Sequence, residues 1–82
     1  VLDVVEPDDL LPRAYELAHA VAAGSPHSLG LVKQLVHEGL TAPVAEHMVR
    51  HTAAMAACFK SDDHREGVAS FLERRPANFT GR

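Results

Sequence analysis

Residues 61–75 of the chain, SDDHREGVASFLERR, predict a helix that contains an unusual residue. Ser61 and the two aspartates after it are typical of a helix start, because their side-chain oxygens accept hydrogen bonds from free backbone N–H groups. Apolar residues then recur at the spacing of one helix face (Val68, Phe71 and Leu72). Gly67 lies inside this helix, where glycine costs about 1 kcal/mol relative to alanine. The question is what a short helix gains from a glycine at that position.

Three further helices are predicted upstream, joined by very short loops. They cover about residues 8–24, 25–39 and 43–59, where apolar residues repeat at helical spacing. Their candidate N-terminal caps are Asp8 or Asp9, Ser25 and Thr41. After the fourth helix Pro76 prevents continuation, and Phe79 is the only large apolar residue left to anchor the C-terminal tail.

The first residues, VLDVVEP (1–7), predict a short strand, because they are rich in β-branched side chains and end in proline. A single strand cannot satisfy its own hydrogen bonds, so we expect it to fray or to pair with another copy. The predicted fold class is therefore all-α, with four short helices and tight loops after an orphan N-terminal strand. The predicted domains are a strand remnant at 1–7 and a helical domain at 8–82.

The composition, net charge and cysteine count exclude several classes of protein and partner. The 82 residues are 46% hydrophobic but only 5% aromatic, so the chain can build only a thin core. A net charge of −3 argues against a nucleic-acid or membrane-surface partner. The single Cys58 excludes an internal disulfide and suits a reducing compartment, so we expect a cytoplasmic protein. We expect no signal peptide, and because the chain opens on Val1 rather than Met we expect a piece of a longer protein.

Two patterns suggest chemistry, but each has a simpler interpretation. His47 and His51 are four residues apart, a spacing that places two metal ligands on one helix face. A zinc-protease pattern requires Glu directly after the first His, where Met48 stands, so we favour a half-exposed helix face and expect no metal. The SDDH start could imply a Ser61–His64 nucleophile and base, but these residues more simply cap a helix. On the residues alone the chain holds no self-contained active site.

The segment FKSDDHREGVASFLERRPANFTGR (59–82) resembles the C-terminal end of the enoyl-CoA hydratase/isomerase (crotonase) superfamily. The upstream residues are similar to the segment in which that family's last strand leads into its helical region. Lys33 also stands where the family commonly has a lysine. The resemblance covers essentially the whole chain. The shared pattern is Ser61, Asp63, Glu66–Gly67, Phe71, Arg74–Arg75 and Phe79.

The resemblance implies that this chain is the C-terminal helical domain of an enzyme of fatty-acid metabolism, which hydrates or isomerises enoyl-CoA thioesters. In that family an N-terminal spiral domain supplies the oxyanion hole and the catalytic glutamates, so no residue here is expected to be catalytic and the segment alone is expected to be inactive. The family's C-terminal helices form the trimer interface, in trimers or dimers of trimers, and help to cover the acyl-CoA site. No cofactor is implied. The alternative is a freestanding helical interaction module without enzymatic activity.

The resemblance also implies roles for particular residues. Gly67 and Phe71 are expected at an interface, where the missing Cβ of glycine lets another backbone or helix approach closely; the alternative is a mild helix penalty without purpose. Arg74 aligns with a lysine that in some relatives reaches the phosphates or the adenine end of CoA, and its other interpretation is a helix-dipole contact. Met55 and Phe59 align with positions that line the substrate-binding region.

Overall fold

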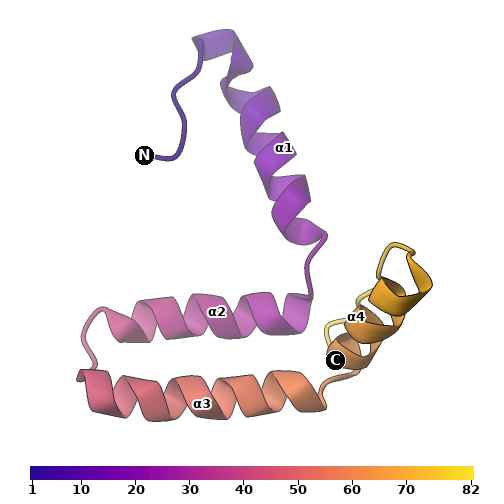
Figure 1. The fold of residues 1–82 in the computed structure, drawn as a ribbon. Helices are drawn as coiled ribbons and strands as arrows, with labels where there is room; N and C mark the ends of the chain where they lie inside the picture. Colours follow the sequence, from indigo (N-terminus) through magenta and orange to yellow (C-terminus); the bar gives the residue numbers. More distant parts are fainter.

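A computed structural model describes all of residues 1–82 as an all-α chain (Figure 1). The predicted four helices are confirmed. A single 3₁₀ turn, η1, precedes the first of them. The elements in chain order are η1 (Pro7–Asp9), α1 (Leu10–Ala22), α2 (Pro26–Gly39), α3 (Val44–Lys60) and α4 (Asp62–Glu73).

The predicted N-terminal strand is wrong for this chain. Residues 1–6 have no regular structure, and the chain contains no strand with which they could pair. A strand requires a partner for its N–H and C=O groups, and β-branched composition cannot replace one. The segment is instead tethered beside α1 by an ion pair, in which Arg13 Nε lies 2.9 Å from Asp3 Oδ2.

The caps follow the prediction in two of four helices. The Ser25 hydroxyl accepts a hydrogen bond from the Ser28 N–H at 3.2 Å, and the Ser61 hydroxyl accepts one from the His64 N–H at 3.0 Å. The predicted caps of the other two helices are wrong. Asp9 precedes α1 without capping it, and α3 begins after Pro43 with no side-chain cap. α1 instead continues from η1, which begins with Pro7, and Pro43 directly precedes α3, so a proline with its fixed φ lies at each entry.

The fourth helix ends two residues before its predicted end. Arg74 adopts the left-handed conformation, with φ 53° and ψ 46°, and the Arg75 N–H donates to the Ser70 carbonyl at 3.0 Å. This closure satisfies carbonyl groups at the helix end and is usually built on glycine. A residue with a side chain in this conformation costs about 1–2 kcal/mol. An arginine is therefore held in a backbone conformation that glycine would adopt more easily.

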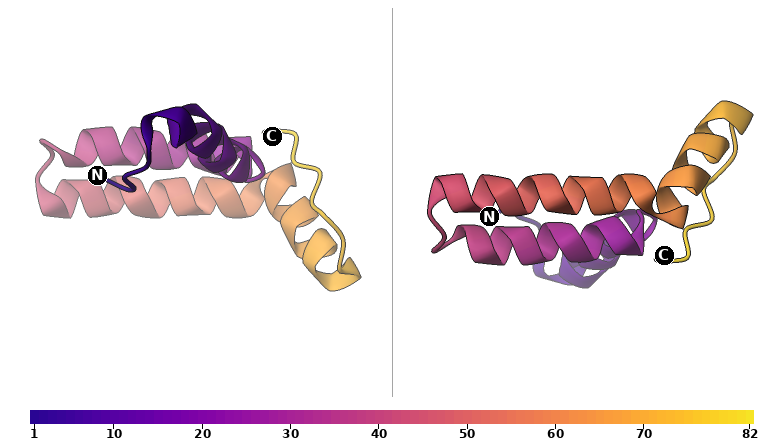
Figure 2. Two further views of the ribbon diagram at one scale, coloured as in Figure 1. Left: turned by 90° about the horizontal axis from the view of Figure 1, so that it is seen from above. Right: turned by 90° about the horizontal axis from the view of Figure 1, so that it is seen from below.

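The helices form an open arrangement. α2 and α3 lie side by side as an antiparallel hairpin, α4 leaves the end of α3 at an angle, and α1 projects away from the hairpin (Figures 1 and 2). The Cα radius of gyration is 16.1 Å, whereas a compact chain of this length has about 11.7 Å. No helix is both long enough and apolar enough to cross a membrane.

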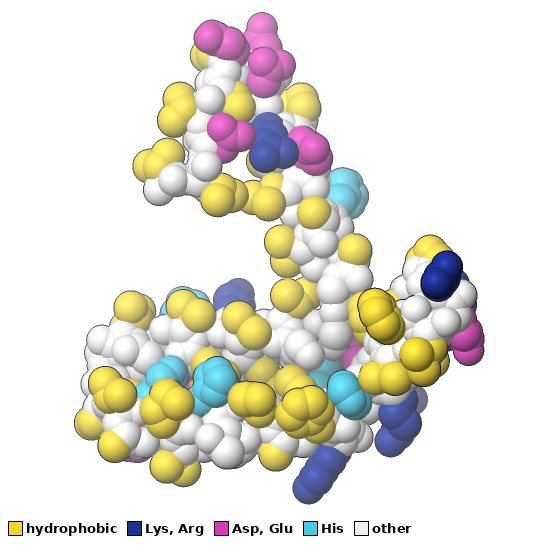
Figure 3. All heavy atoms as spheres, viewed as in Figure 1, with side chains coloured by type: hydrophobic (Ala, Val, Ile, Leu, Met, Phe, Trp, Pro, Cys, Tyr) yellow, Lys and Arg dark blue, Asp and Glu magenta, His cyan; other side chains and the backbone are white.

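The chain has no buried apolar core. Only three residues are buried, and all three are polar: Ser61, Asp63 and Ser70. Hydrophobic side chains instead lie exposed along the hairpin, α1 and α4 (Figure 3). Polar contacts, rather than apolar burial, therefore define how α4 is attached to the rest of the chain.

Candidate functional site

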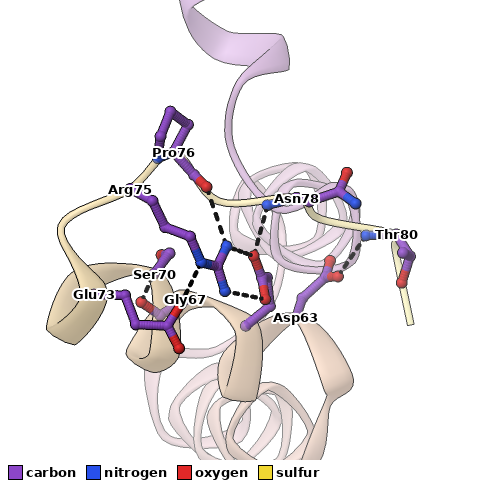
Figure 4. Close-up of polar contacts among 9 residues, drawn as sticks. Asp63, Gly67, Ser70, Glu73, Arg75, Pro76, Asn78 and Thr80 are labelled. Carbon is purple, nitrogen blue, oxygen red and sulfur yellow. Dashed lines mark hydrogen bonds and ion pairs between the residues drawn. The ribbon is translucent and has the colours of Figure 1, made fainter.

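The least exposed residue of the chain is Asp63, which is 2% exposed. Its Oδ2 accepts a hydrogen bond from the Ser25 hydroxyl at 2.6 Å, and its Oδ1 accepts one from the Thr80 N–H at 2.8 Å. The Gly81 N–H lies 3.1 Å from both carboxylate oxygens. The backbone N–H of Asp63 donates to the Arg82 carbonyl at 2.9 Å. One side chain thus joins the start of α2, the first turn of α4 and the C-terminal tail. Figure 4 shows its contact with Thr80 in the tail.

The charge state of Asp63 follows from this geometry. Burial by itself would raise the pKa of its carboxyl group. Hydrogen bonds from the Ser25 hydroxyl and from the backbone N–H groups of Thr80, Gly81 and His27 outweigh that effect and hold the pKa below its usual value. Asp63 is therefore an ionised buried carboxylate whose hydrogen bonds come from neutral donors.

A second carboxylate of α4 holds the same tail. Both Glu66 oxygens face the Arg75 guanidinium, at 2.5 and 3.1 Å, and Oε1 also accepts the Asn78 N–H at 2.8 Å (Figure 4). The Arg75 pair, followed by the Asn78 bond, lowers the pKa of Glu66 to about 2 against the opposing effect of burial. The pKa of Arg75 is raised by Glu66 and then by Glu73. Asp63, Glu66, Arg75 and the tail residues 76–82 are called the C-terminal clip below.

The other two buried side chains are internal to the α3–α4 corner and to α4. Ser61 donates to the Cys58 carbonyl at 2.6 Å, in addition to capping α4. Ser70 donates to the Gly67 carbonyl at 2.9 Å. Because the Ser61 hydroxyl contacts backbone groups on both sides, it is a structural cap and not a nucleophile paired with His64.

The neighbour of Gly67 within the chain is an aromatic side chain. A Cβ built on Gly67 would lie 3.7 Å from Cε1 of Phe79, an ordinary van der Waals distance. The tail therefore brings Phe79 against the bare surface of the helix, as its proposed anchoring role requires. The approach of another subunit's backbone at Gly67 remains a prediction.

Two adjoining hollows form the apolar face of the chain. The first, of about 410 Å³, lies between α4 and the start of α2. The second, of about 150 Å³, lies between α2 and α3, and the two share Ser28 and Cys58. The first is lined mainly by Val68, Phe71, Leu72 and Phe79, with Gly67 beside them. The second is lined mainly by Leu31, Val32, Leu35, Met55 and Phe59.

The structure therefore brings some of the predicted site residues together and separates others. Met55 and Phe59 line one hollow, and Gly67 and Phe71 line the adjoining one. Arg74 lines neither and stands at the far end of α4, about 18 Å along the helix axis from its start. Arg74 follows Phe71, which lines the first hollow, by only three residues, so a ligand of Arg74 must extend along α4 only if it also reaches Met55 and Phe59 in the second hollow.

The histidine pair lies along the seam between α2 and α3. His47 and His51 flank a shallow groove with Val32, Leu35 and Val36. The chain contains no group of three or more His, Cys, Asp or Glu side chains arranged to hold a metal ion. A metal site on this face would need ligands from outside these residues.

Sequence reasoning missed the connections of the C-terminal clip. Asp63 and Glu66 were recognised as parts of a pattern, and Ser25 was recognised as a cap, but no local signal pairs them with residues up to 38 positions away. The spacing of Glu66 and Arg75 is not a helical contact spacing either, because the helix ends between them. The only hint in the residues is an aspartate in the first turn of a helix that is followed by a short tail.

Comparison with known proteins gives a consistent assignment. A family model described as enoyl-CoA hydratase/isomerase matches residues 1–82. The crotonyl-CoA hydratase of Syntrophomonas wolfei is 33% identical over 76 residues, covering 93% of this chain and 29% of that protein. The 1,2-epoxyphenylacetyl-CoA isomerase of Escherichia coli is 30% identical over 82 residues, covering all of this chain and 31% of that protein.

The fold is found in solved structures as well. The crystal structure of enoyl-CoA hydratase from Mycobacterium tuberculosis H37Rv superposes with a TM-score of 0.92 at 27% identity, over 100% of this chain and 32% of that one. The chain therefore spans roughly 30% of the length of the curated relatives and solved structures that it matches.

We predict that acid releases the tail from Glu66. Because the pKa of Glu66 falls from 4.5 to about 2 on folding, its contribution to stability is complete above about pH 4.5 and is lost as the pH falls through about 2. The Asn78 amide resonance, followed by NMR, should therefore titrate near pH 2. Glu66→Gln should abolish this titration, and Asp62→Asn, which changes an exposed carboxylate of the same helix, should not. Titration of the Asn78 amide near pH 4.5 would contradict the assigned ion pair.

Proposed function

Because this chain belongs to the enoyl-CoA hydratase/isomerase family, we propose that it is the C-terminal helical part of an enzyme that hydrates or isomerises enoyl-CoA thioesters. In the complete enzyme it assists oligomerisation and covers the acyl-CoA site. One observation carries this proposal: four helices with apolar faces bury no hydrophobic side chain among themselves. Such faces require a cover from outside the 82 residues.

The size of the uncovered surface supports this role. The chain exposes 6741 Å², about 1,900 Å² more than a compact monomer of its mass would expose. A standard protein interface buries about 1,600 Å² in total. The additional exposed area of this chain is therefore similar to the area that one such interface buries. Large apolar patches on soluble proteins mark interaction or ligand sites.

The proposed division of labour leaves the chemistry outside this chain. Addition of water, or a shift of the double bond, passes through an enolate whose oxygen needs preorganised hydrogen-bond donors. The three buried side chains, Ser61, Asp63 and Ser70, are engaged in a helix cap, in the C-terminal clip and in a bond within α4, so we assign none of them to catalysis. Met55 and Phe59 would border the acyl group, and Arg74 would meet the CoA phosphates.

The experiment that tests this proposal compares the 82-residue chain with a full-length protein that contains it. The full-length protein should convert crotonyl-CoA or an isomeric enoyl-CoA, whereas the 82-residue chain should be helical by circular dichroism and inactive. The isolated chain should also self-associate in light scattering, because its apolar faces are uncovered. Turnover by the isolated chain would refute the division of labour. An inactive full-length protein that binds a protein partner would favour a helical interaction module instead.

We predict that Gly67→Ala stabilises the fold of the chain but weakens the oligomer of the full-length protein. The added methyl group meets Phe79 only at ordinary contact distance, so the free energy of unfolding should rise by up to about 1 kcal/mol through helix propensity. Gly30→Ala is the matched control, because nothing lies within 4 Å of a Cβ at that helical position. In sedimentation of the full-length protein, Gly67→Ala should weaken the oligomer and Gly30→Ala should not. An unchanged oligomer in both variants would remove Gly67, and with it the neighbouring Phe71, from the proposed interface.

We predict a similar trade-off at Arg74, between the stability of the chain and the binding of acyl-CoA. Glycine accepts the left-handed conformation that Arg74 adopts, so Arg74→Gly should raise the free energy of unfolding by about 1 kcal/mol. Arg74 makes no ion pair within the chain, which leaves its guanidinium free for an anion. If it meets a CoA phosphate, Arg74→Gly should raise KM for acyl-CoA with little change in kcat, less so at high salt. Arg65→Gly, a change at another exposed arginine of α4, should leave KM unaltered; equal KM values in all three proteins would return Arg74 to a helix-dipole role.

A further inference from the structure

The angle between α4 and the α2–α3 hairpin has no apolar explanation. No hydrophobic side chain of α4 is buried, and the helix meets α3 directly at the Ser61 corner, without a connecting loop. Phe71 and Leu72 of α4 are 82% and 74% exposed. A helix attached at one end by a corner would be free to swing unless a second attachment fixes it.

The C-terminal tail supplies that second attachment. It turns back at Arg75, runs along α4 and ends beside the start of α2 (Figures 1 and 2). Asn78 bonds to Glu66, and Thr80 and Gly81 bond to Asp63. Gly81 has φ +81°, and a Cβ built on it would lie 3.4 Å from Cβ of Pro26, the first residue of α2. The tail therefore connects α4 to α2. Together with the Ser61 corner, it attaches α4 to the hairpin at two points.

We propose that Asp63 is a positioning residue, which acts through the C-terminal tail to set the angle of α4 and thereby the shape of the surface that covers the acyl-CoA site. This inference rests on the function proposed above and names the residues that organise that surface. Asp63 and Ser25 are among the residues that line the first hollow, but the Asp63 carboxylate is occupied by the Ser25 hydroxyl and by the Thr80 and Gly81 N–H groups. Its effect on ligand binding is therefore expected through the segments it holds.

Two features make Asp63 the centre of this arrangement. It is the one side chain that bonds to both α2, through Ser25, and the tail, through Thr80 and Gly81. It is also buried, so its removal leaves the Thr80 and Gly81 N–H groups without their partner in a site shielded from water. No apolar packing is present to compensate for the loss.

The tail also shapes the apolar face directly. It carries Phe79, which forms one wall of the hollow that contains Phe71. At the other end of α4, the rings of His64 and Phe59 meet edge to face at 5.2 Å. A swing of α4 would therefore remove a wall of one hollow and alter the surroundings of Phe59 in the other. Binding of the acyl-CoA should suffer, while groups that perform the chemistry elsewhere should not.

The test uses a full-length protein that contains this chain, with variants on both sides of the attachment. Asp63→Ala removes the acceptor. Gly81→Ala weakens the attachment of the tail, because an alanine is strained at φ +81° and crowds Pro26. Asp62→Ala is the matched control, because Asp62 lies in the same helical turn but is exposed and pairs only with Arg65.

The first measurement is structural and independent of activity. Hydrogen exchange of the Thr80 and Gly81 amides should accelerate at least about tenfold in Asp63→Ala, because hydrogen bonds to a charged acceptor are among the strong ones. Spin labels at Lys33→Cys and Leu72→Cys, in a Cys58→Ser background diluted with unlabelled protein, should report a broader α2–α4 distance distribution. Asp62→Ala should match the parent in both. An unchanged distance distribution in Asp63→Ala would overturn the positioning role, whatever the enzyme's activity.

The second measurement is kinetic. KM for the acyl-CoA should rise about three- to tenfold in Asp63→Ala and in Gly81→Ala, with kcat changed less than about twofold. Since both variants break one attachment, the double variant should be no worse than the more affected single variant. Additive effects, or equal losses in kcat, would mean general destabilisation and would also overturn the proposal. If the full-length protein turns over no enoyl-CoA, the proposed function fails, while the exchange and distance measurements still decide the role of Asp63.

Discussion

The arrangement of this chain depends on a buried carboxylate that must be satisfied. Asp63 is tolerated at 2% exposure only because a hydroxyl and backbone N–H groups surround its charge. Those donors come from the start of α2 and from the tail. Neither segment can move without exposing the carboxylate of Asp63 or removing its hydrogen-bond donors. In most small domains an apolar core performs this organising role. Here the polar bonds perform it, and they specify one geometry because hydrogen bonds are directional where apolar contacts are not.

This construction explains how four helices keep their apolar faces open. In a chain with an internal core, the leucine, valine and phenylalanine side chains would be buried in that core and would not be exposed. Since the C-terminal clip and the Ser61 corner attach α4 by polar contacts, Phe71, Leu72, Met55 and Phe59 remain on the surface. The chain as a whole is flat and open, with extents of 43 × 40 × 17 Å. This chain of the enoyl-CoA hydratase/isomerase family thus leaves its apolar faces open and encloses no apolar core of its own.

Local features of the sequence predicted most of the secondary structure. The four helices, the caps at Ser25 and Ser61, and the stop after α4 all depend on neighbouring residues, and all were predicted within two or three residues. The prediction of a strand at 1–7 failed because β-branched composition reports what a segment could do when a partner strand is present. The caps at Thr41 and Asp9 failed because a proline and a 3₁₀ turn began those helices instead.

The sequence by itself determined the helices, the family and the pattern from Ser61 to Phe79, because periodicity, capping and motif spacing are local properties. Only the tertiary structure decided what the pattern is for. Asp63 meets Ser25 across 38 positions and Thr80 across 17, and Glu66 meets Arg75 around the end of a helix. It also decided that Arg74 stands apart from Met55 and Phe59. No residue type or spacing predicts these contacts, because they depend on the relative orientation of the helices.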